Sequence, residues 1–467
     1  MLKKETAKLV LDAGLTTGAD YAEIFYEDTY SGVVTMLSGK VDAASTKHLY
    51  GAGIRLLRGN EEVYGYTSDV TEAGLLKLVT SLRDGFDGEP AGITYELTET
   101  DARSIGTVSI VRESRSADLA DKIACMRVVD DAMVAFGDPR IVQRIVNFSD
   151  KTQLVTIAST AGKFVHDIRN QQRIAATAVA REGSRSQSNG SSVGGNFGMD
   201  GYKNKDLPAL GTEVCRACIE MLNAPEMVGG VYPVIIHNGF GGVLFHEACG
   251  HSLEATSVAR NMSVFSGKKG QKIASDIVTA VDDGTIPNEW GSINVDDEGN
   301  PTRRNVLIKN GILTGYMIDG RNSRRMGMKP TGSSRRESYR FSPTSRMTNT
   351  YIANGSSTFE EIIAATEYGL FAKSMGGGSV NPLTGEFNFA VNEGYMVEHG
   401  KITHPVRGAT LIGNGANALL NIDMIAGNQS FGHGMCGSSS GSVPTNVGEP
   451  TIRIQNMTVG GSGKKPE

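Results

Sequence analysis

The chain has 467 residues and a net charge of −5 at pH 7, so no global positive charge attracts nucleic acid or acidic membranes. Hydrophobic residues make up 39% of it, and no run approaches about 18 consecutive apolar residues, which excludes a predicted transmembrane helix. Five cysteines do not make a disulfide framework in a chain of this length, and no signal peptide is recognisable, so we expect a cytoplasmic protein.

The first part of the chain is rich in short β-type runs. Residues 19–66 alternate such runs with glycine-bearing turns, a pattern typical of meandering antiparallel strands. Residues 71–84 begin with an N-cap threonine and repeat apolar residues at helical spacing. Periodicity is lost over residues 85–115, which indicates a boundary. We therefore predict an N-terminal α+β domain over residues 1–95.

A second unit begins with a predicted helix over residues 116–136. Strand-like runs follow it, at residues 140–149, 153–162 and 164–180. The polar tract 181–196 is predicted to be a flexible loop, and residues 206–224 have the apolar stripe of a helix. These elements predict a central α+β domain over residues 100–225.

The last unit opens with a buried strand over residues 231–236. Further on, the dipeptide Asn310-Gly311 lies between apolar runs and predicts a type I′ hairpin, and a second hairpin is expected near Gly400. We predict a C-terminal domain over residues 228–467. Because helices and strands are segregated along the whole chain, the predicted fold class is α+β with mixed or antiparallel sheets.

The C-terminal domain contains the sequence HEACGH, from His246 to His251. In the zinc-protease motif H-E-x-x-H, two histidines four positions apart share one helix face and the glutamate is a general base. Here the histidines are five positions apart, about 140° around a regular helix, and would point to different neighbours. Gly250 tolerates unusual backbone shapes, and a π-bulge, which inserts one residue, would restore the common face.

Two other interpretations of this motif are open from the spacing alone. The histidines can be residues of a buried helix that bond to backbone carbonyls. Glu247 and His251, four positions apart, can form a side-chain pair or can be the metal ligands themselves.

Longer motifs follow HEACGHSLE in the C-terminal sequence. They are DDEGNPT (296–302), RRESYRFSPTSRMTNTYI (335–352), GATLIGNGANALLNIDMIAGN (408–428) and GHGMCGSSSGSVPTNVGEPTIRIQNMTVGG (432–461). With this combination the chain resembles the TldD branch of the TldD/PmbA family, proteins understood as zinc metallopeptidases.

The resemblance implies a role for each residue of the site. His246 and His251 would be zinc ligands, Glu247 would be the base that activates water, and Cys436 in a glycine-rich loop would be the third ligand. A thiolate is a good zinc ligand, and three protein ligands leave one position open for water. From the residues alone, His433, three positions before the cysteine, is an alternative third ligand.

Two segments bear on substrate binding. In the family the cysteine is commonly followed by Gly-Lys-x-Gly-Gln, whereas residues 437–442 here are Gly-Ser-Ser-Ser-Gly-Ser, which removes lysine and glutamine side chains from this loop. Residues 321–346 hold eight Lys/Arg against one Glu. The resemblance places this segment at the substrate cleft, where Arg335, Arg336 and Tyr339 are candidates to hold peptide carbonyls or a carboxylate; a solvated loop is the alternative.

Other cysteines and histidines are predicted to be structural. Cys215 and Cys218 form a CxxC without a second pair nearby, and Cys218 lies on the apolar stripe of a helix. Cys249, inside the motif, is expected to pack rather than to bind metal. His237 precedes Asn-Gly and is predicted to be a turn residue.

The resemblance implies a zinc-dependent metallopeptidase that acts on peptides or unfolded polypeptide, bound in extended form by strand addition. Family members pair through their C-terminal domains, which implies a homodimer or a heterodimer with a PmbA-type partner that lacks the zinc motif. No nucleic-acid or membrane partner is expected. The alternative to an enzyme is a non-catalytic peptide-binding or partner-modulating protein with a structural zinc. A further alternative, a nucleic-acid or gyrase-associated regulator, is disfavoured by the acidic net charge.

Overall fold

The computed structural model of the protein describes residues 2–104, 106, 117–381 and 383–464. Across this part of the chain the strands form three large sheets, and the helices are segregated from them, so the predicted α+β class is confirmed. No described helix is long and apolar enough to span a membrane.

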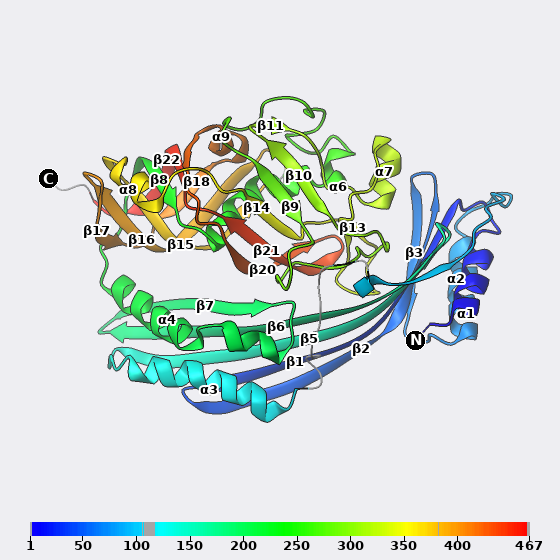
Figure 1. Ribbon diagram of the computed structural model, residues 1–467, viewed down its shortest axis with the longest axis horizontal. Helices are drawn as coiled ribbons and strands as arrows, with labels where there is room; N and C mark the ends of the chain where they lie inside the picture. The colour runs from blue at the N-terminus through cyan, green and yellow to red at the C-terminus, as the bar shows by residue number, and fades with distance from the viewer. Residues whose placement is uncertain (1, 105, 107–116, 382, 465–467) are drawn as a thin grey trace.

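The first sheet combines strands of the first two predicted units. Its order is β3-β2-β1-β5-β6-β4, and β7 also pairs with β6. The strands are β1 (Tyr21–Leu37), β2 (Lys40–Arg58), β3 (Glu61–Thr67), β4 (Thr98–Asp101), β5 (Ile141–Ser159), β6 (Lys163–Glu182) and β7 (Arg185–Gly195). Four of them have 17 to 20 residues and form a long curved sheet below the C-terminal part of the molecule (Figure 1).

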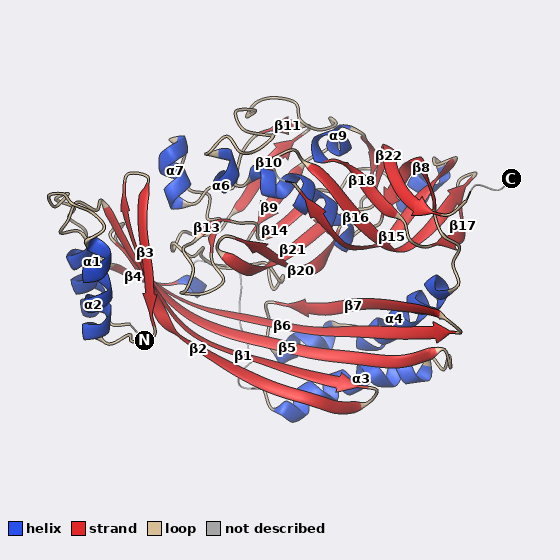
Figure 2. Ribbon diagram, turned by 180° about the vertical axis from the view of Figure 1, so that it is seen from behind, coloured by secondary structure: helices blue, strands red, loops and turns tan. Residues whose placement is uncertain are grey.

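Two pairs of helices cover the two ends of this sheet (Figures 1 and 2). They are α1 (Lys4–Gly14) with α2 (Glu72–Arg83) at one end, and α3 (Leu119–Ala135) with α4 (Leu207–Leu222) at the other. Each pair buries its own apolar cluster against the strands. The helices predicted over 71–84 and 206–224 are confirmed; the start of the one predicted over 116–136 lies outside the described residues. The division into domains 1–95 and 100–225 stays a prediction.

The tract 181–196 is not a flexible loop, and that prediction was wrong. Most of it forms β7, which pairs antiparallel with β6. The ladder begins at the turn, where Glu182 pairs with Arg185, and ends where Gln172 pairs with Gly195. Gly183 lies in the turn with φ of +58°, a conformation that glycine adopts without steric cost. The ladder is made by main-chain groups, so a serine- and glycine-rich sequence can pair although its side chains give no strand signal.

The C-terminal part contains the other two large sheets. One has the order β11-β10-β9-β14-β21-β20. Its strands are β9 (Ala280–Asp283), β10 (Arg304–Lys309), β11 (Ile312–Leu313), β14 (Asn349–Ile352), β20 (Ser430–Ser438) and β21 (Gly441–Glu449).

The other sheet of the C-terminal part has the order β15-β8-β22-β18-β16-β17. Because β15 also pairs with β16, five of these strands close into a ring. Its strands are β8 (Val228–Ile236), β15 (Tyr368–Val380), β16 (Glu386–Glu398), β17 (Lys401–Val406), β18 (Thr410–Asn414) and β22 (Ile452–Ser462), with β19 (Ile422–Ile425) beside β22.

Short elements complete the C-terminal part, and both predicted hairpins are confirmed. The short elements are α6 (Ala255–Val258), α7 (Gly320–Met326), α8 (Phe359–Ala364), α9 (Gly415–Leu420), β12 (Ser334–Arg335) and β13 (Thr344–Ser345). Asn310 and Gly311 have φ of 48° and 79°, as a type I′ turn requires. His399 and Gly400, with φ of 50° and 71°, connect β16 to β17.

Buried ion pairs join the long sheet to the C-terminal part. Arg55 of β2 contacts Glu23 of β1 at 2.8 Å and Glu298 at 2.6 Å, and Arg169 of β6 contacts Asp297 at 2.6 Å. Charges buried this deeply are tolerated because each has a partner. The contacts fix how the long sheet lies against the sheet that contains β20.

Candidate metal centre

The HEACGH segment is an irregular helix. A short 3-10 turn (Phe240–Gly242) leads into α5 (Val243–Phe245), and His246–Gly250 then form a π-helix before another 3-10 turn. The wider π-turn inserts the extra residue, so two histidines five positions apart share one face. The predicted distortion of this helix is confirmed.

Cys436 comes to the two histidines from β20. Its Sγ lies 3.2 Å from Nε2 of His246 and 3.2 Å from Nε2 of His251. One ligand atom from each residue falls in a group whose members are all within 4.8 Å of one another. The structure therefore brings together the three side chains that the sequence suggested as metal ligands.

The surroundings of Cys436 favour its thiolate. Burial acts to raise the pKa of the thiol, but the neighbouring imidazoles of His246 and His251 outweigh burial and lower the pKa to about 3. The deprotonated form of cysteine is the one that binds metal. Imidazole nitrogen and thiolate sulfur are both zinc ligands, and three protein ligands leave one coordination position open.

Glu247 lies at the edge of this group. Its carboxylate is 3.6 Å from Nε2 of His251, and its side chain is 30% exposed, against 13% for His251. The carboxylate is thus beside the ligand atoms and still accessible to solvent. A general base needs this combination, whereas an acid buried for structural reasons would be enclosed.

A carboxylate and a guanidinium that the sequence did not suggest support the centre. Glu254 accepts a hydrogen bond from Nδ1 of His251 at 3.1 Å, which leaves Nε2 for a metal. Arg346 is fully buried and donates to the carbonyl of Cys436 and, at 3.1 Å, to Oγ of Ser440. Its Nε is also 3.8 Å from the Glu254 carboxylate. Cys436 thus lies on a strand and not in the glycine-rich loop expected from the sequence, and Arg346 connects this strand to the residue that orients His251.

Gly250 is required for a different reason than the sequence suggested. Its φ of −56° and ψ of −51° are ordinary helical values, so no special backbone shape is needed. A Cβ at this position would lie 2.4 Å from Sδ of Met347. The glycine therefore allows close packing of the π-helix on the segment before β14.

His433, the alternative third ligand, is not in the group of candidate ligands. It is three positions from Cys436 on β20, so its side chain lies on the opposite face of the strand. Its ring is 6.1 Å from that of Trp290. Burial, together with the cations Arg173 and Lys205, lowers its pKa to about 4, so the ring is neutral at physiological pH.

The remaining cysteines and His237 have structural surroundings. Cys215 and Cys218 are buried on α4, and burial raises the pKa of both thiols. Cys249 is buried beside the ligands, and burial raises the pKa of its thiol too. His237 faces Oγ1 of Thr451 at 3.1 Å, just after β8.

The three residues suggested for substrate binding are buried where the C-terminal part meets the long sheet. Arg335 donates to the carbonyl of Met347 at 2.6 Å, and Arg336 contacts Glu23 of β1 at 2.5 Å. Tyr339 is 2% exposed and packs in a small cluster with residues of β1 and β5. In this structure their side chains are occupied by contacts within the chain, and their role toward substrate stays a prediction.

Two imidazoles, a thiolate and a partly exposed carboxylate on an α+β fold define a candidate centre of the metal-dependent hydrolase class. Three family models match the chain: the PmbA/TldA metallopeptidase C-terminal domain over residues 229–461, the central domain over 112–222 and domain 1 over 22–85. The chain belongs to the PmbA/TldD metallopeptidase family.

Relatives of similar length carry metalloprotease names. The metalloprotease TldD homolog of Haemophilus influenzae is 34% identical over 468 residues, which cover 99% of this chain and 97% of that protein. A metalloprotease of Methanothermobacter thermautotrophicus is 29% identical, with 95% and 96% covered. The alignments extend over almost the whole chain, so the relatives share all parts of this architecture.

Solved structures share the fold at low sequence identity. A putative modulator of a DNA gyrase from Thermotoga maritima has a TM-score of 0.79 at 19% identity, covering 98% of this chain and 100% of that one. TldE from Thermococcus kodakarensis has a TM-score of 0.74 at 18% identity, with 97% and 99% covered.

Proposed function

We propose that the protein is a zinc-dependent peptidase that hydrolyses peptides or unfolded polypeptide. The observation that supports this most directly is the convergence of His246, His251 and Cys436 within 4.8 Å, with the Glu247 carboxylate beside them. Metalloprotease names among full-length relatives agree with it.

Zinc fits this group of donors. Bond lengths of about 2.3 Å to sulfur and 2.0–2.1 Å to nitrogen place the two kinds of ligand atom about 3.5 Å apart around a tetrahedral ion. The two nitrogen–sulfur distances of 3.2 Å are within a few tenths of an ångström of that value. His246, His251 and Cys436 would hold the ion; when bound, zinc polarises a peptide carbonyl and acidifies water.

Glu247 supplies the proton transfers. Its carboxylate accepts the proton of the attacking water and then delivers it to the nitrogen of the leaving amine, so that one side chain acts first as base and then as acid. Glu254 holds Nδ1 of His251, and Arg346 holds the carbonyl of Cys436, which keeps the ligand side chains in place during this exchange.

Substrate in extended form suits the strand that contains Cys436. β20 is the last strand in its sheet: it pairs with β21 on one side and, among the described residues, has only an isolated bridge from Gly239 to Phe431 besides that ladder. A free strand edge offers main-chain groups to an extended peptide and selects little among side chains. The substrate class is therefore unfolded chain rather than folded protein.

The active assembly is a dimer, either of two copies or with a PmbA-type partner. The TldE structure, which shares this fold, supports a partner of compatible shape. Mass determination of the protein alone and after mixing with a family member would separate the two forms.

The variant Glu247→Gln tests the catalytic role. Glutamine keeps the shape of the side chain but cannot take up a proton at neutral pH. We expect the variant to retain zinc and peptide affinity while turnover of denatured protein falls about 100- to 10,000-fold. Glu360→Gln, at an exposed glutamate of α8, is the matched control and should leave turnover unchanged.

Two results would contradict this function. Near-normal turnover by Glu247→Gln would remove the base from the mechanism. If the zinc-loaded wild type binds unfolded peptide in either dimeric form and cuts none, the protein is a peptide-binding or partner-modulating protein with a structural zinc.

A further inference from the structure

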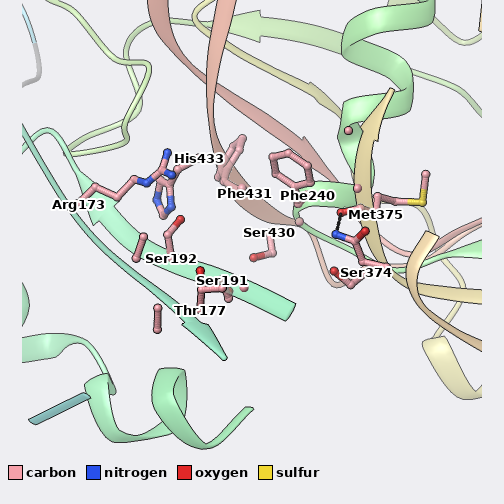
Figure 3. A pocket seen from close by; sticks show the side chains of 18 of the residues that line it. Arg173, Thr177, Ser191, Ser192, Phe240, Ser374, Met375, Ser430, Phe431 and His433 are labelled. Atoms are coloured by element: carbon pink, nitrogen blue, oxygen red, sulfur yellow. Dashed lines mark hydrogen bonds between the residues drawn. The ribbon is translucent and has the colours of Figure 1, made fainter. Parts of the chain in front are cut away.

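A cavity of about 530 Å³ lies between the long sheet and the strand that contains Cys436 (Figure 3). Strands β6 and β7 form one wall, and β15, β20 and the turn before α5 form the others. The side chains that line it are mostly small and polar: Thr177, Ser191, Ser192, Asn238, Ser374, Asn392 and Ser430, with Phe240, Phe431 and Met375 as the apolar ones.

The cavity contains a guanidinium to which no described residue supplies a counter-ion. Arg173 extends from β6 into the cavity beside His433 (Figure 3). Its guanidinium has no hydrogen bond or ion pair with any residue that the structure describes, and no described lining residue carries a carboxylate. Burial lowers the pKa of Arg173, which agrees with a guanidinium that has no carboxylate partner among the described residues.

Three other deeply placed arginines differ from Arg173 in having a carboxylate partner, whereas Arg335 donates to the carbonyl of Met347. Arg55, Arg169 and Arg336 each contact a carboxylate at 2.8 Å or less. A partly desolvated cation surrounded by hydroxyl and amide donors is costly by itself and gains stability when an anion enters. The cavity therefore has the composition of an anion site and not of an internal ion pair.

The charge and surroundings of the site select the kind of anion. One guanidinium matches the single charge and the two oxygens of a carboxylate, which it can bind through two parallel hydrogen bonds. His433 is neutral and adds no second charge, as a phosphate would need. Serine hydroxyls and asparagine amides add donors for the same two oxygens.

We infer that this cavity binds a carboxylate of the peptide substrate, with Arg173 as its anchor. The inference deepens the proposed peptidase function and rests on it. His433 is three positions from Cys436 along β20, so the cavity lies about 10 Å from the metal ligands at ~3.3 Å per residue. A peptide that follows the free edge of β20 thus reaches Arg173 with about three residues beyond the metal site.

Binding to the Glu247→Gln protein tests this assignment without cleavage. The probe is an acetylated hexapeptide of alanine and tyrosine in three forms: the C-terminal acid, the C-terminal amide, and the amide with one alanine replaced by glutamate. We expect the acid or the glutamate form to bind about ten- to a hundredfold more tightly than the plain amide, the usual range for a hydrogen-bonded charge. Isothermal titration measures each affinity.

Variants of Arg173 give the critical comparison. Arg173→Gln should abolish the preference for a carboxylate, and Arg173→Lys, which keeps the charge, should retain part of it. Arg181→Gln, at an exposed arginine further along β6, is the control and should keep the full preference. A preference confined to the acid identifies the terminal carboxylate, and one confined to the glutamate form identifies an acidic side chain.

Equal affinities of all three forms, or a preference that survives in Arg173→Gln, would overturn the inference. Turnover of the same peptides by the wild type separates this result from the proposed function. Cleavage without dependence on Arg173 refutes the cavity assignment alone. A carboxylate preference that depends on Arg173 without any cleavage refutes the peptidase function and leaves the binding site standing.

Discussion

The contact between Arg346 and Glu254 provides a quantitative test of how the metal centre is held. Both side chains are almost fully buried, at 0% and 4% exposure, and their nearest charged atoms are 3.8 Å apart. At an effective dielectric constant of about 20, two unit charges at this distance attract by about 4 kcal/mol. Removal of one partner leaves the other buried charge without this counter-ion, which typically costs about 3–5 kcal/mol.

We therefore expect Arg346→Met and Glu254→Gln each to lower the free energy of unfolding by about 3–5 kcal/mol. The double variant should lose about 4 kcal/mol less than the sum of the two, because it removes both charges together. Urea unfolding in the presence of a chelator measures these free energies without the contribution of metal binding. Zinc titration of the same proteins should show affinities about 10- to 100-fold weaker than that of the wild type.

A surface ion pair serves as the control for this cycle. Lys8 and Asp12 of α1 are 49% and 48% exposed and 3.1 Å apart. Their coupling in the same kind of cycle should be about 0.2–1 kcal/mol. If the Arg346–Glu254 coupling is no larger than this, the two residues do not act as a pair, and the support of His251 by Arg346 is refuted.

Three further predictions concern the ligands, the π-helix and the response to pH. Cys436→Ser should abolish tight zinc binding while His433→Ala retains it, as elemental analysis would show; the reverse outcome would make His433 the ligand. Gly250→Val should impair zinc binding because its Cβ would lie 2.4 Å from Sδ of Met347, and Met347→Ala should partly restore it; an unaffected single variant contradicts this packing. Burial raises the pKa of Asp282 to about 6, so the folded state binds the proton more tightly than the unfolded state. The contribution of Asp282 to the free energy of unfolding is therefore fully present below about pH 4. It decreases as the pH rises and is about 3 kcal/mol smaller above about pH 6. Urea unfolding should show this difference in the wild type and a smaller one in Asp282→Asn; equal differences would contradict the assignment.

The geometry of the candidate centre could be predicted in part because its determinants are local. The extra residue between the histidines indicates a π-bulge, and the motif places Glu247 beside them. Cys436 follows from the family resemblance and not from spacing. Arg346 could not be predicted, since it contacts the Cys436 carbonyl across 90 positions of the chain, a contact that only the packing of β20 and β21 on the segment before β14 creates.

The fold shows the same division between local and long-range determinants. Hairpins at Asn310-Gly311 and Gly400 depend on the conformations of two residues each, so sequence identifies them. β7 depends on main-chain pairing with β6, and its serines and glycines carry no strand signal, which explains why residues 181–196 were predicted as a loop. The cavity between β7 and β20 could not be predicted for that reason.

The order of strands in the long sheet has a consequence for synthesis of the protein. In the ladder between β1 and β5, Glu23 pairs with Ser159 at one end and Leu37 pairs with Ile145 at the other. Even the pair closest in sequence, Leu37 and Ile145, is therefore 108 positions apart. At about 5–20 residues per second, a ribosome needs on the order of ten seconds to supply that partner. During this interval one edge of β1 has no native partner, and unpaired edges promote aggregation. We expect the nascent chain to depend on a chaperone until β5 has emerged.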